Sequence, residues 1–175
     1  MSPVPEPTAR LFFREWRSDD WPLAFALWGD ARVTAFIGGQ FTEAQVRQRL
    51  QEQMDLQRQH GFQYWPVFQR DSGEHIGCCG LRPRDLPQGI LEIGFHLRPQ
   101  SWGKGYATEA AQAVSSYAFE KLGARALFAG HHPQNASSRR TLEKLGFQYS
   151  HDEPYAPTGL RHPSYFLRRD EITED

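Results

Sequence analysis

The sequence has few of the features that mark several large classes of protein. Its two cysteines, Cys78 and Cys79, are adjacent, which excludes a disulfide framework and gives no metal-ligand spacing. A formal net charge of −1 calls for neither nucleic acid nor an anionic membrane as a partner. No apolar run approaches the roughly 20 residues that span a bilayer, and no signal-peptide core is present near the N-terminus. We therefore expect a cytoplasmic protein without a metal site.

The composition that remains is typical of a globular protein. Hydrophobic residues make up 39% of the chain, charged residues 23% and aromatic residues 13%, enough for a sizeable core. A length of 175 residues suits one domain. We expect a flexible, proline-rich tail over residues 1–9 and a single domain over residues 10–170. The pair Cys78 and Cys79 is expected to lie in a strand as small apolar residues, with a redox or catalytic role as the alternative.

Hydrophobic periodicity predicts strands and helices in a mixed order. Asp19 and Asp20 are expected to complement the first turn of a helix, and Thr42 with Gln45 forms a capping-box pattern. Residues 82–89 and 150–162 are expected to be loops. The predicted elements are a strand over 11–16, helices over 21–28 and 43–59, strands over 64–70, 75–81 and 91–98, a helix over 105–121, a strand over 125–130, a helix over 135–145, and strands over 147–150 and 162–168.

The most informative segment is a glycine loop between a strand and a helix, over residues 102–109. Such a helix start offers free N–H groups and a positive dipole end, which suit a phosphate. A Walker A loop is disfavoured because Gly105 follows Lys104, where Ser or Thr is required. A dinucleotide fingerprint is disfavoured because its third glycine position is Thr108. A turn that binds nothing is the remaining alternative.

Together with this loop, several short motifs resemble the GNAT acetyltransferases, and within them the RimJ/RimL-like branch. The resemblance covers nearly the whole chain and rests on the order and spacing of the motifs. The motifs are Arg10-Leu11-Phe12-Phe13-Arg14, His75-Ile76-Gly77-Cys78-Cys79-Gly80-Leu81, Glu92-Ile93-Gly94-Phe95, Trp102-Gly103-Lys104-Gly105-Tyr106-Ala107-Thr108-Glu109-Ala110, Asn135-Ala136-Ser137-Ser138 and Lys144-Leu145-Gly146-Phe147.

The resemblance implies an α+β (mixed α/β) GNAT fold. Its central twisted sheet would be mostly antiparallel, with one splayed parallel strand pair and about four flanking helices. It implies acetyl-CoA as co-substrate, with its pyrophosphate on the glycine-loop amides. Trp102 stands where the general superfamily pattern has Gln or Arg. The residues implied in cofactor binding are Leu97, Trp102, Gly103, Lys104, Gly105, Tyr106, Ala107, Thr108, Asn135 and Arg140.

Transfer of an acetyl group to an amine requires proton removal from the amine and tolerance of the departing thiolate. Alternation in the strand over 91–98 places Glu92 and His96 on one face, where either is a candidate base if that face lines the cleft. A solvated polar face is the alternative. The general-acid tyrosine of many GNAT enzymes is replaced by Leu142, so Ser138 or water is the candidate proton donor. For Asn135 the alternative role is a helix N-cap.

Arg140 and Lys144 lie on one helix face and could reach the 3′-phosphate of coenzyme A, although a solvated face explains them equally well. His131 and His132 have no third ligand at metal-binding spacing. The acceptor, a small-molecule or peptide amine, should be framed by residues 36–62 and by residues 150–162, which include Asp152, Glu153 and Tyr155. The two carboxylates would suit a cationic amine, although an ordinary exposed loop explains them equally well.

The resulting hypothesis is an N-acetyltransferase that acts on a primary amine, as a monomer or homodimer. A non-catalytic coenzyme A-binding or interaction module on the same fold is the main alternative, because the usual tyrosine is missing. A nucleotide-binding oxidoreductase is a third, which a thermal shift with coenzyme A but not with dinucleotides would dismiss.

Overall fold

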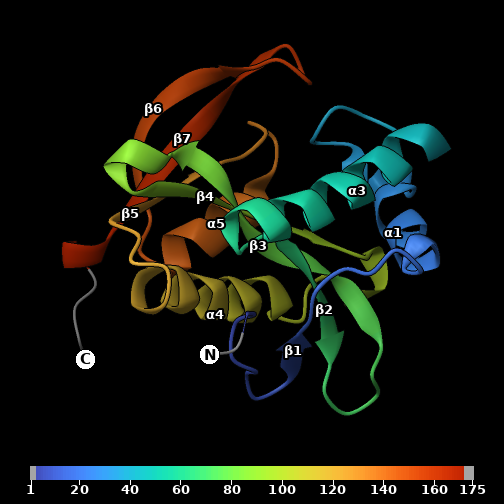
Figure 1. The fold of residues 1–175 in the computed structure, drawn as a ribbon. Helices are drawn as coiled ribbons and strands as arrows, with labels where there is room; N and C mark the ends of the chain where they lie inside the picture. Colours follow the sequence, from blue (N-terminus) through green and yellow to red (C-terminus); the bar gives the residue numbers. More distant parts are fainter. Residues whose placement is uncertain (1–2, 172–175) are drawn as a thin grey trace.

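The computed structural model describes residues 3–171 and has helices on both faces of one sheet (Figure 1). No helix within these residues is long and apolar enough to cross a membrane. The helices and strands are β1 (Leu11–Phe13), α1 (Trp21–Trp28), α2 (Ala31–Thr34), α3 (Glu43–His60), β2 (Tyr64–Gln69), β3 (His75–Asp85), β4 (Ile90–Leu97), α4 (Tyr106–Glu120), β5 (Ala126–Gly130), α5 (Ala136–Lys144), β6 (Gln148–Tyr155) and β7 (Leu160–Arg168).

The seven strands of the described chain follow the order β1-β2-β3-β4-β5-β7-β6. All neighbours are antiparallel except β4 and β5, which run parallel. These two strands pair only where Ile90, Leu91 and Glu92 face Ala126, Leu127 and Phe128. From Ile93 onward β4 pairs with no described residue on this side, so the strands separate toward their carboxyl ends. The expected mixed fold with one splayed parallel pair is confirmed.

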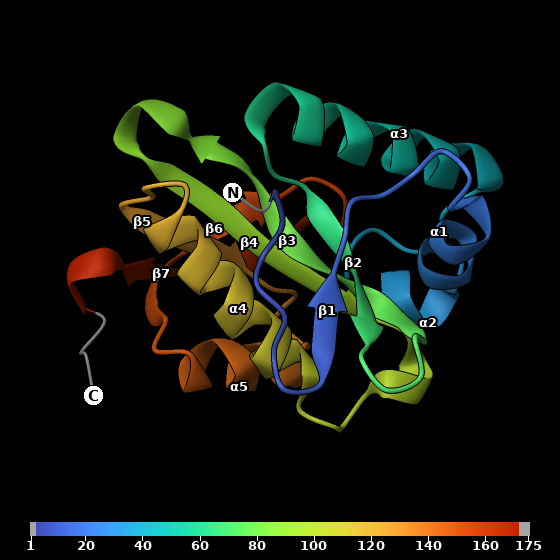
Figure 2. The same ribbon diagram turned by 60° about the horizontal axis from the view of Figure 1, so that its bottom comes forward.

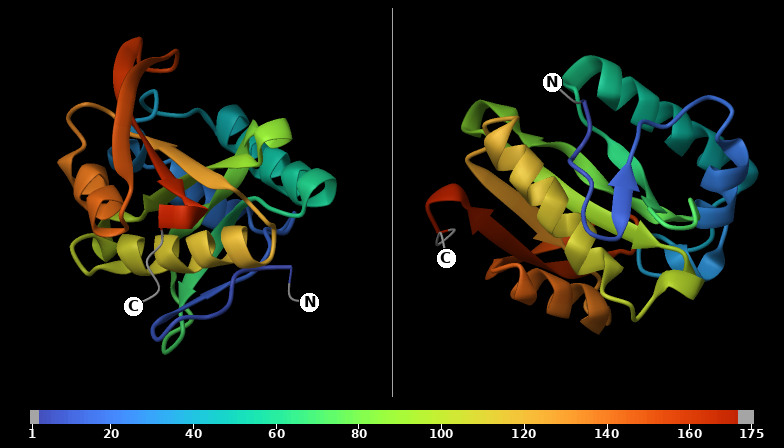
Figure 3. Two further views of the ribbon diagram at one scale, coloured as in Figure 1. Left: turned by 90° about the vertical axis from the view of Figure 1, so that its left-hand side faces the viewer. Right: turned by 90° about the horizontal axis from the view of Figure 1, so that it is seen from below.

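Two hydrophobic clusters lie on opposite faces of the sheet. The larger one packs α4 against the sheet and takes Leu91 and Ile93 from β4, with Phe95 and Leu97 packed against it. The smaller one joins α1 and α3 to the opposite face, through residues such as Trp28, Leu50 and Tyr64. Figure 2 and the two views in Figure 3 agree that α3 and α4 cover different faces. The predicted alternation along β4 is confirmed.

The capping residues predicted from the sequence lie at the ends of most helices in the structure. Thr42 and Gln45 form the reciprocal capping box before α3, and Gly61 ends this helix with φ +78°. Asp20 precedes α1 but makes no side-chain cap. Its carboxylate instead binds the Arg14 guanidinium and accepts the Arg17 N–H, because that nearby cation competes for its oxygens.

Four boundaries differ from the predictions. β1 ends at Phe13, and the four-residue helix α2 was not predicted. β3 continues to Asp85 through the expected loop, since Arg82 and Pro83 pair with Glu92 and Leu91. Residues 150–162 form most of the β6–β7 hairpin rather than a loop. β6 is almost wholly exposed, so its sequence lacks the apolar alternation that marks a half-buried strand.

The expected tail contacts the domain in the part that is described. Val4 packs against the larger cluster, and the Thr8 hydroxyl donates to Glu109 in α4 at 2.6 Å. Cys78 and Cys79 are both buried, free thiols in β3, as predicted.

Candidate active site

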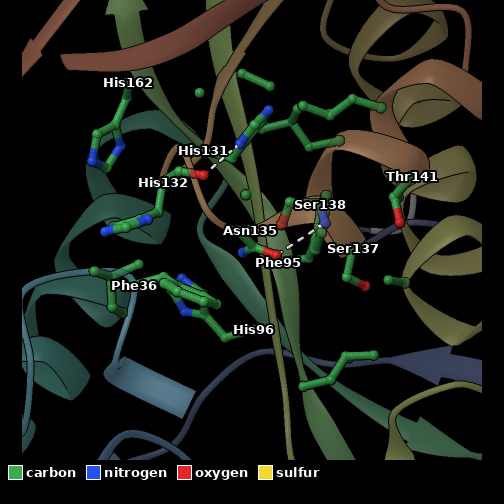
Figure 4. Close-up of a pocket in the computed structure, with 18 of the residues that line it drawn as sticks. Phe36, Phe95, His96, His131, His132, Asn135, Ser137, Ser138, Thr141 and His162 are labelled. Atoms are coloured by element: carbon green, nitrogen blue, oxygen red, sulfur yellow. Dashed lines mark hydrogen bonds between the residues drawn. The ribbon is translucent and has the colours of Figure 1, made fainter. Parts of the chain in front are cut away.

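A cavity of about 680 Å³ runs through the gap between β4 and β5. Its lining includes α4 and α5 residues from one face of the sheet and α3 and β6 residues from the other. Figure 4 shows Phe36, His96 and His132 in one group, and Ser137, Ser138 and Thr141 in another. The cavity therefore has two halves, which we call the helix α4 half and the helix α3 half.

The glycine loop forms one wall of the helix α4 half. Gly103 and Gly105 adopt φ +72° and +80°, a left-handed conformation that side chains disfavour. Within residues 3–171 no acceptor is paired with any backbone N–H from Gly103 to Thr108, and the first bonded amide is that of Glu109, to the Gly105 carbonyl. Six consecutive free amides at a helix start make an anion cradle. This geometry fits the pyrophosphate of coenzyme A.

Two cations of α5 face the same half of the cavity. Arg140 and Lys144 line it together with the loop residues Trp102, Gly103 and Gly105. Lys104 does not line it; its carbonyl accepts from Arg10, which also pairs with Glu109. The positive charge on this wall of the cavity therefore comes from Arg140 and Lys144, and not from Lys104 as the sequence had suggested.

The open edge of β4 carries backbone groups aimed into the gap. Arg98 N–H bonds to the Ile76 carbonyl at 2.8 Å, on the β3 side. Because backbone groups alternate along a strand, the N–H of Leu97, like that of Phe95, points away from β3 into the gap. The Leu97 carbonyl accepts the Trp102 indole N–H at 2.8 Å. The Leu97 amide is therefore positioned as a donor to a ligand carbonyl, and Trp102 has a structural task that the sequence did not reveal.

The start of α5 closes the other side of the gap. Asn135 Oδ1 accepts the Ser138 N–H at 3.1 Å, so the predicted N-cap is present. Asn135, Ser137 and Ser138 all line the cavity. Leu142 also lines it and is almost fully buried, so no tyrosine hydroxyl enters from that position. Sequence reasoning missed Ser137, whose exposure could not be read from its spacing.

Glu92 reaches the cavity but not as an isolated carboxylate. Its Oε1 accepts from Arg82 at 2.7 Å, across the β3–β4 pair. Its Oε2 has no partner within the described residues. The side chain is 16% exposed. One carboxylate oxygen is therefore fixed by the arginine while the other is available to a ligand.

His96 lies on the same face of β4 and is held by α1. The Trp28 indole N–H donates to His96 Nδ1 at 3.1 Å, which leaves the proton of the neutral ring on Nε2. Burial, with Arg49 and Arg82 nearby, lowers the pKa of His96 to about 3. A ring that remains neutral at such acidity is a poor acceptor of an ammonium proton. As a base His96 is thus weaker than expected, although it does line the cavity.

A cluster of rings lines the helix α3 half near the mouth of the gap. His132 packs on Phe36 with ring centres 4.8 Å apart, and Tyr155 stacks on His162 at 4.4 Å. His131 is buried and bonded to the His132 carbonyl and the Tyr165 hydroxyl. Within residues 3–171 no group of His, Cys, Asp and Glu side chains is arranged to hold a metal ion.

The acidic residues expected to attract a cationic amine are not free to do so. Glu153 lines the cavity but forms two hydrogen bonds with Arg84, each 2.8 Å long. Asp152 does not line it and accepts from Tyr149. Tyr155 does line the cavity. Sequence reasoning missed Arg49 and Tyr64, which also line the cavity and come from distant elements.

The fold, the gap between two parallel strands and the free-amide cradle define an acyl-CoA-dependent acetyltransferase. Comparison with known families agrees, because residues 10–148 match the acetyltransferase (GNAT) domain. The chain belongs to the GNAT acetyltransferase family.

Curated relatives are of similar length. An uncharacterized N-acetyltransferase p20 of Bacillus licheniformis is 32% identical over 143 residues, which cover 81% of this chain and 80% of the relative. An uncharacterized N-acetyltransferase YoaA of Bacillus subtilis (strain 168) is 31% identical over 150 residues, covering 85% and 84%.

Solved structures share the architecture. A GNAT-family acetyltransferase from Bacillus anthracis has a TM-score of 0.83 at 25% identity, covering 95% of this chain and 99% of that one. A RimL ribosomal-protein alpha-N-acetyltransferase in complex with coenzyme A has a TM-score of 0.82 at 14% identity, covering 94% and 97%. The second likeness concerns the fold alone.

Proposed function

We propose that this protein transfers the acetyl group of acetyl-CoA to a primary amine bound in the helix α3 half of the cavity. The observation that carries the proposal is the run of free amides from Gly103 to Thr108, beside the gap between β4 and β5. Such a cradle suits a diphosphate, and the gap leads from it to the opposite face of the sheet.

On this proposal, acetyl-CoA supplies an acetyl thioester and the protein holds it from several sides. The amides of Gly103, Gly105 and Thr108 bind the pyrophosphate, and Arg140 with Lys144 faces the 3′-phosphate. Asn135 borders the pantetheine arm. The Leu97 N–H, aimed into the gap, donates to the thioester carbonyl and stabilises negative charge that develops there. Trp102 keeps Leu97 in place through its carbonyl.

Glu92 is the proposed base. Its Oε2 is free to accept a proton from the incoming amine, directly or through a water, while Arg82 fixes Oε1. His96 contributes differently from a base, since its Nε2–H is a donor that can orient the acceptor. The reaction joins the amine nitrogen to the acetyl carbon and breaks the carbon–sulfur bond, with the sulfur leaving as thiolate. The hydroxyl of Ser138, at the start of α5, is the proposed proton donor to that sulfur.

The test is thiol release from acetyl-CoA in the presence of a panel of primary amines, small molecules and peptides. Turnover with at least one amine supports the proposal. Coenzyme A binding without turnover on any amine would favour a non-catalytic coenzyme A-binding module on the same fold. A monomeric or homodimeric state remains a prediction that sedimentation would check.

A further inference from the structure

The charges in the helix α3 half of the cavity do not balance. Within the described residues, two carboxylates line the cavity, and each is already bound by an arginine: Glu92 by Arg82 and Glu153 by Arg84. Two further arginines on this side line the cavity: Arg32, which pairs with Asp30 outside the lining, and Arg49. Of these four arginines, Arg49 is the one that no carboxylate of the described residues neutralises.

Arg49 is placed to meet a ligand. It projects from α3, is half-buried, and packs over the rings of Trp28 at 5.4 Å and Phe41 at 4.9 Å. No described residue forms an ion pair or hydrogen bond with its guanidinium, whereas Arg47 on the same helix pairs with Glu43. Trp28 in turn binds His96, on the open segment of β4. Arg49 thus contacts Trp28, and Trp28 contacts His96 in the strand that borders the gap.

We propose that the acceptor is a primary amine whose own molecule carries a carboxylate, an amino acid being the simplest case, and that Arg49 binds this carboxylate. The inference rests on the proposed acetyl transfer and names its substrate class. A guanidinium presents paired donors that match a carboxylate's two oxygens. Because the Arg49 guanidinium packs over two rings, its orientation is fixed before the ligand binds. Binding there directs the amine of the same molecule toward Glu92 and the gap.

The same charges disfavour polycationic acceptors. A polyamine or an aminoglycoside needs several free carboxylates, whereas both carboxylates of the described lining are already paired with an arginine and only Oε2 of Glu92 is left open. Additional positive charge beside Arg49 would be repelled. The proposal therefore replaces the expectation that residues 150–162 attract a cationic amine with a preference for an amine that carries a carboxylate.

The test compares acids with their amides. L-leucine and L-phenylalanine, their amides, and spermidine are offered with acetyl-CoA, and kcat/KM is expressed per unprotonated amine. We expect each acid to exceed its amide by at least about tenfold in kcat/KM. Arg49→Gln should reduce that ratio to about one, and Arg49→Lys should give an intermediate ratio. Arg47→Gln, an exposed change on the same helix, should preserve it.

Several outcomes would overturn the inference. These are a preference for spermidine or the amides in the unaltered protein, or an acid-to-amide ratio that survives Arg49→Gln. If no acceptor is turned over although coenzyme A raises the melting temperature, the proposed transfer fails separately. Calorimetric titration of L-leucine and L-leucinamide into the coenzyme A complex then tests whether Arg49 binds the carboxylate, because binding does not require turnover. Equal affinity for the two ligands would overturn that part of the proposal.

Discussion

The indole N–H of Trp28 donates to Nδ1 of His96 at 3.1 Å, linking the first helix to the open segment of β4. The bond settles which ring nitrogen carries the proton and makes protonation at Nδ1 incompatible with it. His96 is consequently a fixed neutral donor at the cavity wall. A second buried histidine, His75, lies at the start of β3, beside the rings of Trp16 and Phe68.

Because of these two histidines, we expect the free energy of unfolding to fall in mild acid. Burial, followed by Arg98, lowers the pKa of His75 to about 4, and His96 has a pKa of about 3, both from 6.5. The unfolded chain therefore takes up protons below about pH 6.5 that the folded protein does not, so stability falls as the pH falls. Each histidine should cost roughly 2 kcal/mol at pH 5.

Urea unfolding between pH 7.5 and 5 measures this effect. In that interval most carboxylates remain ionised in both states, so the histidines dominate the slope. His96→Gln should flatten part of it. A free energy of unfolding that is constant over the interval, or a slope that His96→Gln leaves unchanged, would contradict the assignment.

A negative side chain at Gly105 should abolish coenzyme A binding. Gly105→Asp puts a carboxylate where the proposed diphosphate lies and strains a backbone at φ +80°. Calorimetry and thermal shift with coenzyme A provide the measurement. Gly73→Asp is the matched control, since Gly73 has φ +72° in a turn of the chain and does not line the cavity. If the Gly105 variant bound coenzyme A with unchanged affinity, the loop amides would not be the diphosphate site.

Removing the carboxylate at position 92 should slow turnover without weakening coenzyme A binding. We expect Glu92→Gln to lower kcat by on the order of a hundredfold, as for loss of a positioned base. Arg82→Gln breaks the same ion pair but keeps the carboxylate, and should retain far more activity. If both variants lose activity equally, the pair has a structural role and Glu92 is not the base.

Loss of the indole donor at Trp102 should affect catalysis more than cofactor affinity. Trp102→Phe frees the Leu97 carbonyl, so the neighbouring amide is held less firmly toward the gap. One neutral hydrogen bond corresponds to a reduction of about two- to tenfold in kcat. Trp21→Phe, on α1 and outside the cavity lining, should leave kcat unchanged. A change confined to the affinity for coenzyme A would assign Trp102 to the cradle instead.

A side chain at Gly94 should disturb the packing against Tyr64 in the cavity wall. A Cβ there would overlap the Tyr64 hydroxyl and lie 2.7 Å from Tyr64 Cζ. Since Tyr64 is only 6% exposed, it cannot move aside freely, and Gly94→Ala should destabilise the protein by about 1–3 kcal/mol. Tyr64→Leu should relieve the overlap, so the double variant should be more stable than the sum of the single changes. Additive free energies of unfolding would show that the two sites are independent.

The sequence was most informative where the signal is local. The glycine loop, the capping box at Thr42 and the alternation along β4 each depend on neighbouring residues, and the structure has all three. Relationships between distant elements had no such signal. The pairing of Glu92 with Arg82 depends on strand register, and Arg49 reaches the cavity only because α3 packs across the sheet. The exposed β6–β7 hairpin was missed because its outer strand buries too little to show a pattern.

The separation of β4 from β5 also has a mechanical consequence. Within residues 3–171, only three residue pairs between β4 and β5 join the strands β1 to β4 to the strands β5 to β7, so the sheet has a seam across its middle. An extended pantetheine arm lying in that seam would take the place of the missing strand partner, and the two parts should then resist opening together. The Phe95 and Leu97 amides, which point into the gap, should then exchange slowly in the complex and fast without it, as expected if the cosubstrate takes the place of a strand.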